Sequence, residues 1–134
     1  VMLARIRDLT SRRIDFAFES TLASRSLVDV IREARAQRFR IAVVFFWLSS
    51  PDLAVARVRE RVRNGGHFVP EVTVRRRYQR GIENFFGLYR PLADEWRFYD
   101  NSEKDGPRLI ARGAAGSEDT IIDGTTWRRA RSSE

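Results

Sequence analysis

The chain has 134 residues, 15.6 kDa and no cysteine, which limits it to one domain or part of one and excludes disulfides and thiolate metal sites. Its 43% hydrophobic and 32% charged residues exclude wholesale disorder, and the single histidine excludes the usual zinc sites with three or four ligands. The net charge of +7 comes almost wholly from arginine, since Lys104 is the only lysine, and it allows an anionic partner such as nucleic acid, nucleotide or a phosphorylated metabolite.

The amino-terminal third predicts two helices and two strands. Apolar residues at helical spacing predict a helix over residues 2–13, and alternation predicts a strand over residues 14–18. Ser24 or Ser26 can cap a helix that runs to Arg38. The nearly continuous β-branched and aromatic run over residues 39–48 predicts a strand buried on both faces of a parallel sheet.

The rest of the chain alternates helices and short strands. A helix should begin after Ser49 and Ser50, with Pro51 in its first turn, and end near Gly65. The next helix opens at Pro70 and carries an apolar stripe: Val74, Tyr78, Ile82, Phe85 and Tyr89. Strands over residues 96–99, 108–111 and 120–122 and a last helix near Thr125 follow. The predicted class is α/β, with a parallel sheet flanked by helices.

Polar residues follow three of these strands, at Glu19-Ser20-Thr21, Ser49-Ser50 and Asp100-Asn101. Ligands of open parallel sheets bind at the carboxyl ends of strands, so these residues are candidates for substrate binding. For Ser49 and Ser50 a helix-capping role is the alternative. For Glu19 the alternative is an ion pair with one of the many arginines.

Arginines on the two central helices are the second group of candidates. Arg57 and Arg61 lie one turn apart on one flank, and like charges at this spacing destabilise a helix unless a phosphate or an acid lies between them. Arg75 flanks the apolar stripe of the following helix and can point toward a ligand. His67 follows two glycines in the connecting loop, which can cover a ligand, but it has no acid–base partner nearby in sequence.

Five segments in this order resemble the zeta-toxin family of P-loop kinases, in the branch with a GGH-x-VP segment. They are FESTLASR from Phe18, FFWLSSPDLAVARVRERV from Phe45, GGHFVPE from Gly65, RRRY from Arg75 and YDNS from Tyr99. The resemblance implies an ATP-dependent phosphotransferase with a P-loop NTPase-like sheet, a helical lid over about residues 51–90 and Mg²⁺ as cofactor. It further implies UDP-N-acetylglucosamine as one acceptor and allows an antitoxin partner.

The resemblance also assigns roles to individual residues. Glu19, with Ser20 and Thr21 beside it, matches the substrate-binding glutamate, and Ser49 matches a hydroxyl that contacts substrate. Arg61 matches a lid arginine that neutralises ATP phosphates, which places it above Arg57. His67 stands where the zeta toxins proper have a second phosphate-binding arginine, and Arg75 can substitute for it.

Two parts of the family pattern do not occur in these residues. The phosphate-binding loop G-x-x-x-x-G-K-S/T is absent, and the resemblance implies that both this loop and the catalytic aspartate lie upstream of Val1. Residues 1–104 are therefore expected to be the carboxyl-terminal two-thirds of a kinase domain, and residues 105–134 an extension of the same domain. No catalytic base and no metal ligand is assigned, and these residues alone should not support useful kinase activity.

Three other interpretations stay open. The chain could belong to a kinase of the same fold that acts on another hydroxylated metabolite, or be a basic nucleic-acid-binding module, or be an inert remnant. Acidic residues among the arginines, and aromatic residues mostly on the core stripe, argue against nucleic acid as the partner. The short apolar runs and the lack of a secretory signal pattern predict a soluble, cytoplasmic protein without a membrane partner.

Overall fold

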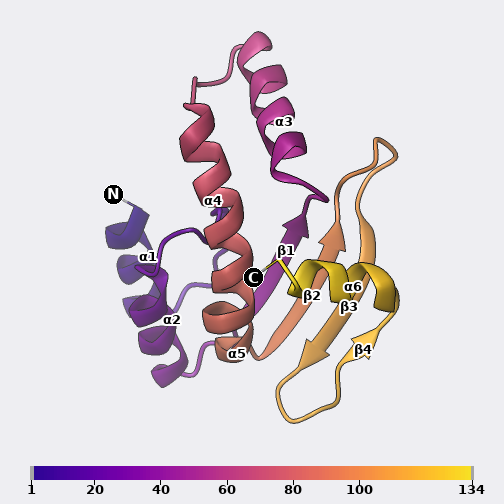
Figure 1. Cartoon of the computed structure of the whole chain (residues 1–134). Helices are drawn as coiled ribbons and strands as arrows, with labels where there is room; N and C mark the ends of the chain where they lie inside the picture. The colour runs from indigo at the N-terminus through magenta and orange to yellow at the C-terminus, as the bar shows by residue number, and fades with distance from the viewer. Residues whose placement is uncertain (1, 134) are drawn as a thin grey trace.

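Four strands form one mixed sheet in the computed structural model, which describes residues 2–133 (Figure 1). The order is β1 (Ala42–Trp47), β2 (Glu95–Asp100), β3 (Arg108–Ala114) and β4 (Thr120–Ile121). The α/β class is confirmed, but only β1 and β2 are parallel; β3 and β4 are antiparallel to their neighbours. The prediction of a parallel sheet is wrong there because short turns, and not crossover helices, join β2 to β3 and β3 to β4.

The helices surround this sheet unevenly. Figure 1 shows α4 and α6 in front of the sheet, α1 and α2 to one side, and α3 and α4 rising together beyond the strands. This hairpin occupies the region expected to be a lid. The bounds are α1 (Met2–Ser11), α2 (Leu27–Ala36), α3 (Pro51–Arg63), α4 (Glu71–Asn84), the π-helix η1 (Phe85–Tyr89), α5 (Arg90–Leu92) and α6 (Gly124–Arg131).

Local signals set the ends of α3 as predicted. The Ser50 hydroxyl accepts a hydrogen bond from the Leu53 amide at 3.1 Å, and Pro51 occupies the first turn. After the helix, Gly65 adopts a φ of +93°, a left-handed conformation that favours glycine. The strand–helix junction at residues 48–51 is therefore fixed by the sequence around it.

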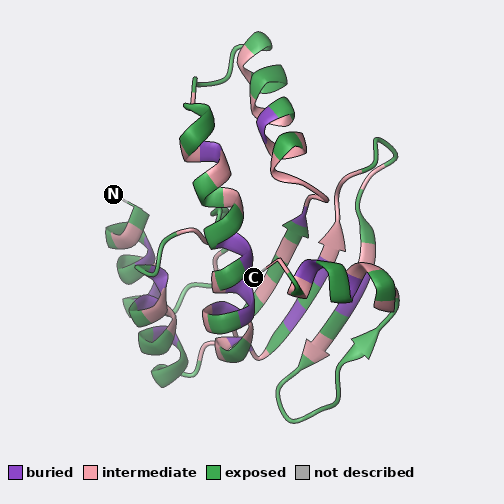
Figure 2. Cartoon of the chain, in the orientation of Figure 1, coloured by how far each residue is buried: buried purple, intermediate pink, exposed green. Residues whose placement is uncertain are grey.

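The core lies between the sheet and the helices in front of it (Figure 2). Phe45 of β1 stacks on Phe85 at 4.9 Å between ring centroids and lies 5.6 Å from Phe98 of β2. Trp96 and the α6 residue Trp127 stack at 5.4 Å with only 10° between their planes. The predicted apolar stripe is confirmed across α4 and η1, since Ile82, Phe85 and Tyr89 are almost fully buried. We call this side of the sheet the inner face.

The opposite side, the outer face, is exposed. Along β1 the side chains alternate, so that Trp47 is 2% exposed while Val44 and Phe46 are 50% and 53% exposed. The prediction of a strand buried on both faces is therefore wrong. The physical reason is that no helix among residues 2–133 covers the outer face, so only every second residue of β1 contributes to the core.

Residues 14–18 form no strand, contrary to prediction. β1 has a free edge, but this segment does not run along it as a strand. Its aromatic side chains pack on each other instead: Phe16 stacks with Phe18 at 6.2 Å and lies 6.1 Å from Phe39. Phe16 also joins the small core that α1 and α2 form around Tyr89.

Candidate functional site

The carboxyl ends of β1 and β2 meet in a network of backbone and polar groups. The Ser49 amide donates to the Ser102 hydroxyl at 2.9 Å, and the Asn101 amide donates to the Trp47 carbonyl at 2.8 Å. The Ser102 hydroxyl in turn donates to an Asp100 carboxylate oxygen. Two of the three predicted strand ends, those at Ser49 and at Asp100, therefore lie side by side, as parallel pairing requires.

Arg57 and Arg61 of α3 both line a hollow beside these strand ends. Arg57 donates to the backbone carbonyls of Asn101 and Ser102 at 2.9 and 3.0 Å, so it also joins α3 to the end of β2. Arg61 is exposed and forms no ion pair with any described residue. The hollow has a volume of about 380 Å³ and is lined by Phe46, Leu48, Arg57, Glu60, Arg61, Asn64 and Asn101. The arginine pair predicted from helical spacing is thus placed at one site.

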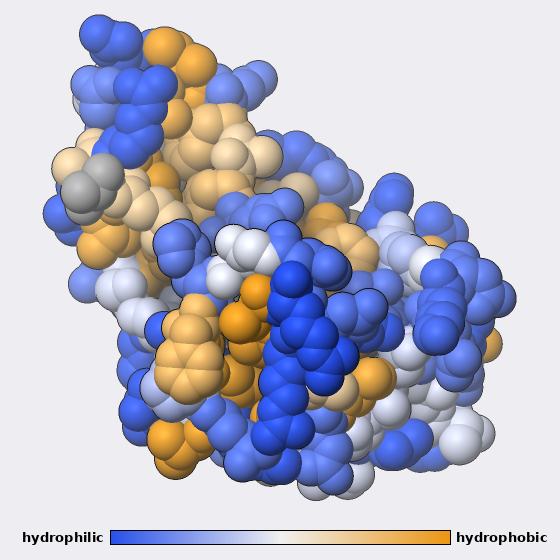
Figure 3. Space-filling view, turned by 90° about the horizontal axis from the view of Figure 1, so that it is seen from above, coloured by the Kyte–Doolittle hydropathy of each residue, from blue (hydrophilic) through white to orange (hydrophobic). Residues whose placement is uncertain are grey.

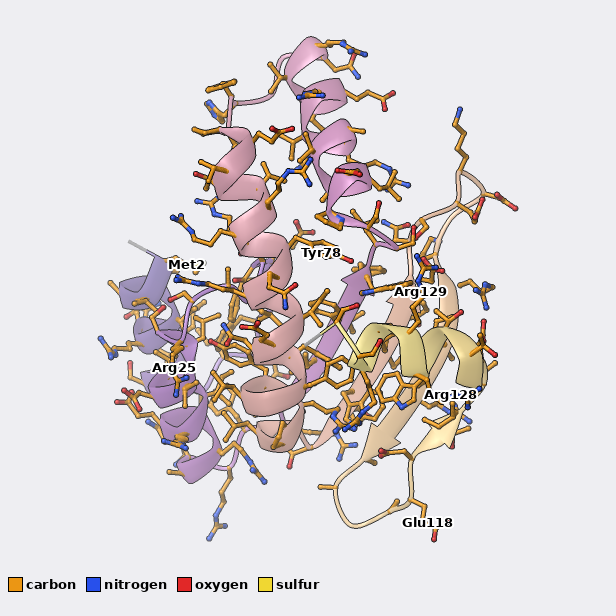
Figure 4. The ribbon with its side chains drawn as sticks, in the orientation of Figure 1. Met2, Arg25, Tyr78, Glu118, Arg128 and Arg129 are labelled. Atoms are coloured by element: carbon orange, nitrogen blue, oxygen red, sulfur yellow. The ribbon has the colours of Figure 1, made fainter. Side chains whose placement is uncertain are left out.

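Two side chains from distant elements close over the end of β1 (Figure 4). Tyr78 of α4 donates its hydroxyl proton to the Leu48 carbonyl at 2.8 Å, and burial raises the pKa of this tyrosine. Arg129 of α6 donates to the Ser49 carbonyl at 3.0 Å and lies over the Trp47 ring at 5.7 Å. These two hydrogen bonds tie the end of β1 to α4 and to α6.

The structure places the other predicted phosphate-binding residues away from this hollow. Arg75 bridges α3 and α4, because it donates to Asp52 at 2.7 Å and lies 3.5 Å from Glu71, and the hydrogen bond to Asp52 raises the pKa of Arg75. His67 is exposed in the loop between the two helices and does not line the hollow. In this arrangement Arg75 is a structural ion-pair partner.

Glu19, Ser20 and Thr21 lie in a loop against α4 and are all exposed. The Ser20 hydroxyl accepts from the Leu22 amide at 3.1 Å, and the Thr21 hydroxyl accepts from the Ala23 amide at 3.3 Å. The Asn84 amide group ties the loop to α4 by donating to the Leu22 carbonyl at 2.7 Å. None of the three predicted substrate-binding residues lines the hollow that contains Arg61. Their role stays a prediction.

The catalytic base and the phosphate-binding loop were expected upstream of Val1. Val1 itself lies outside the described residues, which begin at Met2, so the structure places neither group. Their position stays a prediction from the resemblance. Within residues 2–133 the site therefore consists of candidate binding groups alone.

A second, apolar hollow lies between α3 and α4. It has a volume of about 380 Å³ and is lined by five valines, by Phe68 at the loop end and by the charged residues Arg59, Arg63 and Glu71. Figure 3 looks down on the molecule from the hairpin end, where apolar side chains gather between hydrophilic ones. Phe68 itself is 78% exposed. None of the predicted site residues lines this hollow.

Sequence reasoning missed Tyr78 and Arg129 as parts of the site. Helical spacing places Tyr78 on the apolar stripe of its helix, and its ring does pack there while its hydroxyl reaches the strand end. Arg129 lies 80 residues beyond Ser49, so no local pattern signals their contact. The only available signal was the surplus of arginine near the carboxyl terminus.

The described part of the chain holds neither a cluster of metal ligands nor a membrane-spanning helix. Within residues 2–133 no three histidine, aspartate or glutamate side chains come together as a possible metal site. None of the helices in that range has the length and apolar character needed to cross a bilayer.

Comparison with known proteins finds similarity over half of the chain. A Haemophilus influenzae protein described as "Uncharacterized protein" is 31% identical over 67 residues, which are 50% of this chain and 48% of that protein. The chain therefore matches about half the length of this curated relative. No family model matches the chain, and no solved structure matches it.

Proposed function

We propose that this chain is the larger part of a zeta-toxin-like, ATP-dependent phosphotransferase and that its Arg57–Arg61 hollow binds nucleotide phosphates. The observation that carries the proposal is the convergence of two arginines on the carboxyl ends of parallel strands, where α/β proteins bind their ligands. The ordered resemblance of five sequence segments supports the same reaction class. The acceptor is a hydroxylated small molecule such as UDP-N-acetylglucosamine.

Arg57 and Arg61 have different roles in this proposal. Arg57 is held by the carbonyls of Asn101 and Ser102, so its charge stays fixed at the strand ends. Arg61 has no acidic partner among the described residues, so its guanidinium is available to a phosphate. Phosphoryl transfer depends on positioning and on neutralising charge on the phosphate oxygens, and this pair supplies both near one point.

The chain fits only part of what the family requires. The arginines fit the phosphates of ATP, but no cluster of carboxylates within residues 2–133 fits Mg²⁺, and the phosphate-binding loop is absent from the sequence. We therefore assign binding, and no catalytic step, to these residues. Turnover of ATP with UDP-N-acetylglucosamine by the purified 134-residue chain is expected to be absent.

Titration calorimetry with ATP tests the proposal. The chain should bind ATP, and Arg61→Ala should weaken binding about tenfold, because a hydrogen-bonded charge is lost. Arg76→Ala is the matched control, since Arg76 is an exposed helical arginine of α4 that forms no ion pair with any described residue. Equal weakening by both variants, or no ATP binding at all, would contradict the assignment.

A further inference from the structure

Asp100 ends β2 but does not line the hollow that contains Arg57 and Arg61. Its side chain is only 13% exposed, and one of its carboxylate oxygens accepts hydrogen bonds from both the amide and the hydroxyl of Ser102. The bond from the amide is 2.9 Å long. A carboxylate that is largely withdrawn from water needs such donors, and here both belong to one residue of the turn after β2. Asp100 therefore holds Ser102 in place.

The other carboxylate oxygen of Asp100 faces the next strand. It lies 3.6 Å from the guanidinium of Arg108 on β3, and Arg108 also binds Asp123, the residue that caps α6, at 2.8 Å. Both oxygens of Asp100 thus have partners among the described residues, and no ligand is needed to account for this carboxylate. Its contacts indicate a role in holding the turn after β2.

Ser102 contacts two parts of the candidate site. Its hydroxyl accepts from the Ser49 amide at 2.9 Å, which links the turn to the junction between β1 and α3. Its carbonyl and that of Asn101 both accept from the same nitrogen of the Arg57 guanidinium, at 3.0 and 2.9 Å. Arg57 forms no ion pair with any described residue, so these two hydrogen bonds determine how its guanidinium is oriented.

We propose that Asp100 and Ser102 are positioning residues that hold the Arg57 guanidinium at the hollow in the orientation in which it binds a phosphate. This inference rests on the proposed function of the hollow, but it assigns no contact with ATP to either residue. A charge that is held in place before the ligand arrives loses little conformational freedom on binding. The position of Asp100 after a strand makes it a candidate for substrate binding, whereas its contacts make it a support for an arginine.

Nuclear magnetic resonance of the arginine Nη–H groups tests the orientation of Arg57 in the full chain without a ligand. Arg57 should show separate Nη–H signals, because hydrogen bonds to two carbonyls slow the rotation of its guanidinium. In Ser102→Ala these signals should merge, since neither the Ser49 amide nor Asp100 can bind the missing hydroxyl. Ser102→Thr retains the hydroxyl and should keep them separate. Asp100→Ala is the second variant, and it should act like Ser102→Ala because it releases the turn.

Two controls separate this effect from a general loosening of the chain. The guanidinium of Arg75 is bound by a carboxylate of α3 at 2.7 Å, so its signals should stay unchanged in every variant. Ser11→Ala removes a hydroxyl bonded to a backbone carbonyl of α1, and it should leave Arg57 unchanged. The proposal is overturned if the Arg57 signals stay separate in either alanine variant of the turn, or if the Arg75 signals merge together with them.

Titration calorimetry with ATP measures the consequence for binding. Arg57→Ala should weaken binding about tenfold and Ser102→Ala about fivefold, the scale of one hydrogen bond each. Because Ser102 acts through Arg57, the double variant should lose about tenfold, as Arg57→Ala does alone. A loss of about fiftyfold would overturn the proposal, because the two residues would then act independently. Absence of ATP binding would overturn the proposed function of the hollow, whereas the signals of the free chain would still decide the role of Ser102.

Discussion

The two faces of the sheet are built from the same strands and have opposite character. On the inner face Phe45 and Phe98 pack with aromatic residues of η1 and α6, Trp47 packs on Phe98, and Phe98 is completely buried. On the outer face Phe46 is more than half exposed next to a pair of arginines. This contrast indicates that inner-face residues determine stability, while outer-face residues contribute little to the core.

The largest expected difference between the two faces is in the free energy of unfolding after removal of one aromatic ring from each. Phe98→Ala should lower the free energy of unfolding by about 3–5 kcal/mol, because it empties a site contacted by Phe45, Phe86, Trp47 and Trp127. Urea unfolding followed by circular dichroism measures it. Phe46→Ala should cost less than about 1 kcal/mol because the ring is exposed. Similar losses for the two variants would remove the distinction between the faces.

Adding a methyl group to the inner face should have a smaller but clear effect. A Cβ at Gly113 would lie 2.5–2.6 Å from the Trp96 ring, which is held by stacking on Trp127. Gly113→Ala should therefore destabilise the protein by about 1–3 kcal/mol in thermal or urea unfolding. At Gly87 nothing lies within 4 Å of the added carbon, so Gly87→Ala is the control. Unchanged stability of Gly113→Ala would mean that the inner face is loosely packed.

The stability of α6, which packs on the inner face, should depend on pH through the residue that caps its amino terminus. Asp123 caps α6 by accepting from the Thr126 amide and binds Arg108 at 2.8 Å, and these contacts lower its pKa from 3.8 to about 2. Because the pKa is lower in the folded state, the ionised carboxylate stabilises the fold at pH values above the ordinary pKa. This stabilisation is lost as the pH falls from about 4 to about 2.

Unfolding measured across that range should show a smaller acid-induced loss in Asp123→Asn than in the natural sequence. The asparagine retains a capping oxygen but cannot titrate, so it isolates the ionisation. Identical pH profiles for the two proteins would show that the Asp123 charge does not support α6.

The smallest expected effect is a gain in stability from a substitution on the outer face. Replacing one member of the Arg97–Arg112 pair by glutamine relieves repulsion across the strands and should raise the free energy of unfolding by about 0.2–1 kcal/mol. Urea unfolding measures this gain, and the same substitution at Arg76 should leave stability unchanged. A loss of stability in Arg97→Gln would show that the arginine pair supports the fold.

Much of the fold was accessible from sequence where the signal is local. The Ser50 cap, the Gly65 turn and the apolar stripe of α4 depend on residues within a few positions of each other, and all are confirmed. The prediction of a strand over residues 14–18 is wrong although β1 has a free edge, so alternation alone does not decide whether a segment joins a sheet. The prediction that β1 is buried on both faces is wrong because a run of apolar residues does not show which elements cover a strand.

In the candidate site, too, local relations were predictable from the sequence and long-range contacts were not. Helical spacing was enough to place Arg57 and Arg61 together, because both belong to one helix. Its position beside the apolar stripe allows Arg75 to point toward a ligand, and in the structure it pairs with Asp52 of α3. Contacts such as Arg129 with Ser49 join residues from opposite parts of the chain, and only the folded arrangement reveals them.

Our central claim is that anions bind to particular arginines and not to the basic surface in general. Nuclear magnetic resonance of the arginine side-chain Nε–H groups during ATP titration tests it most directly. We predict saturable shifts of the Arg57 and Arg61 signals while the Arg76 signal stays in place. Small, parallel shifts of all exposed arginine signals, without saturation, would contradict it.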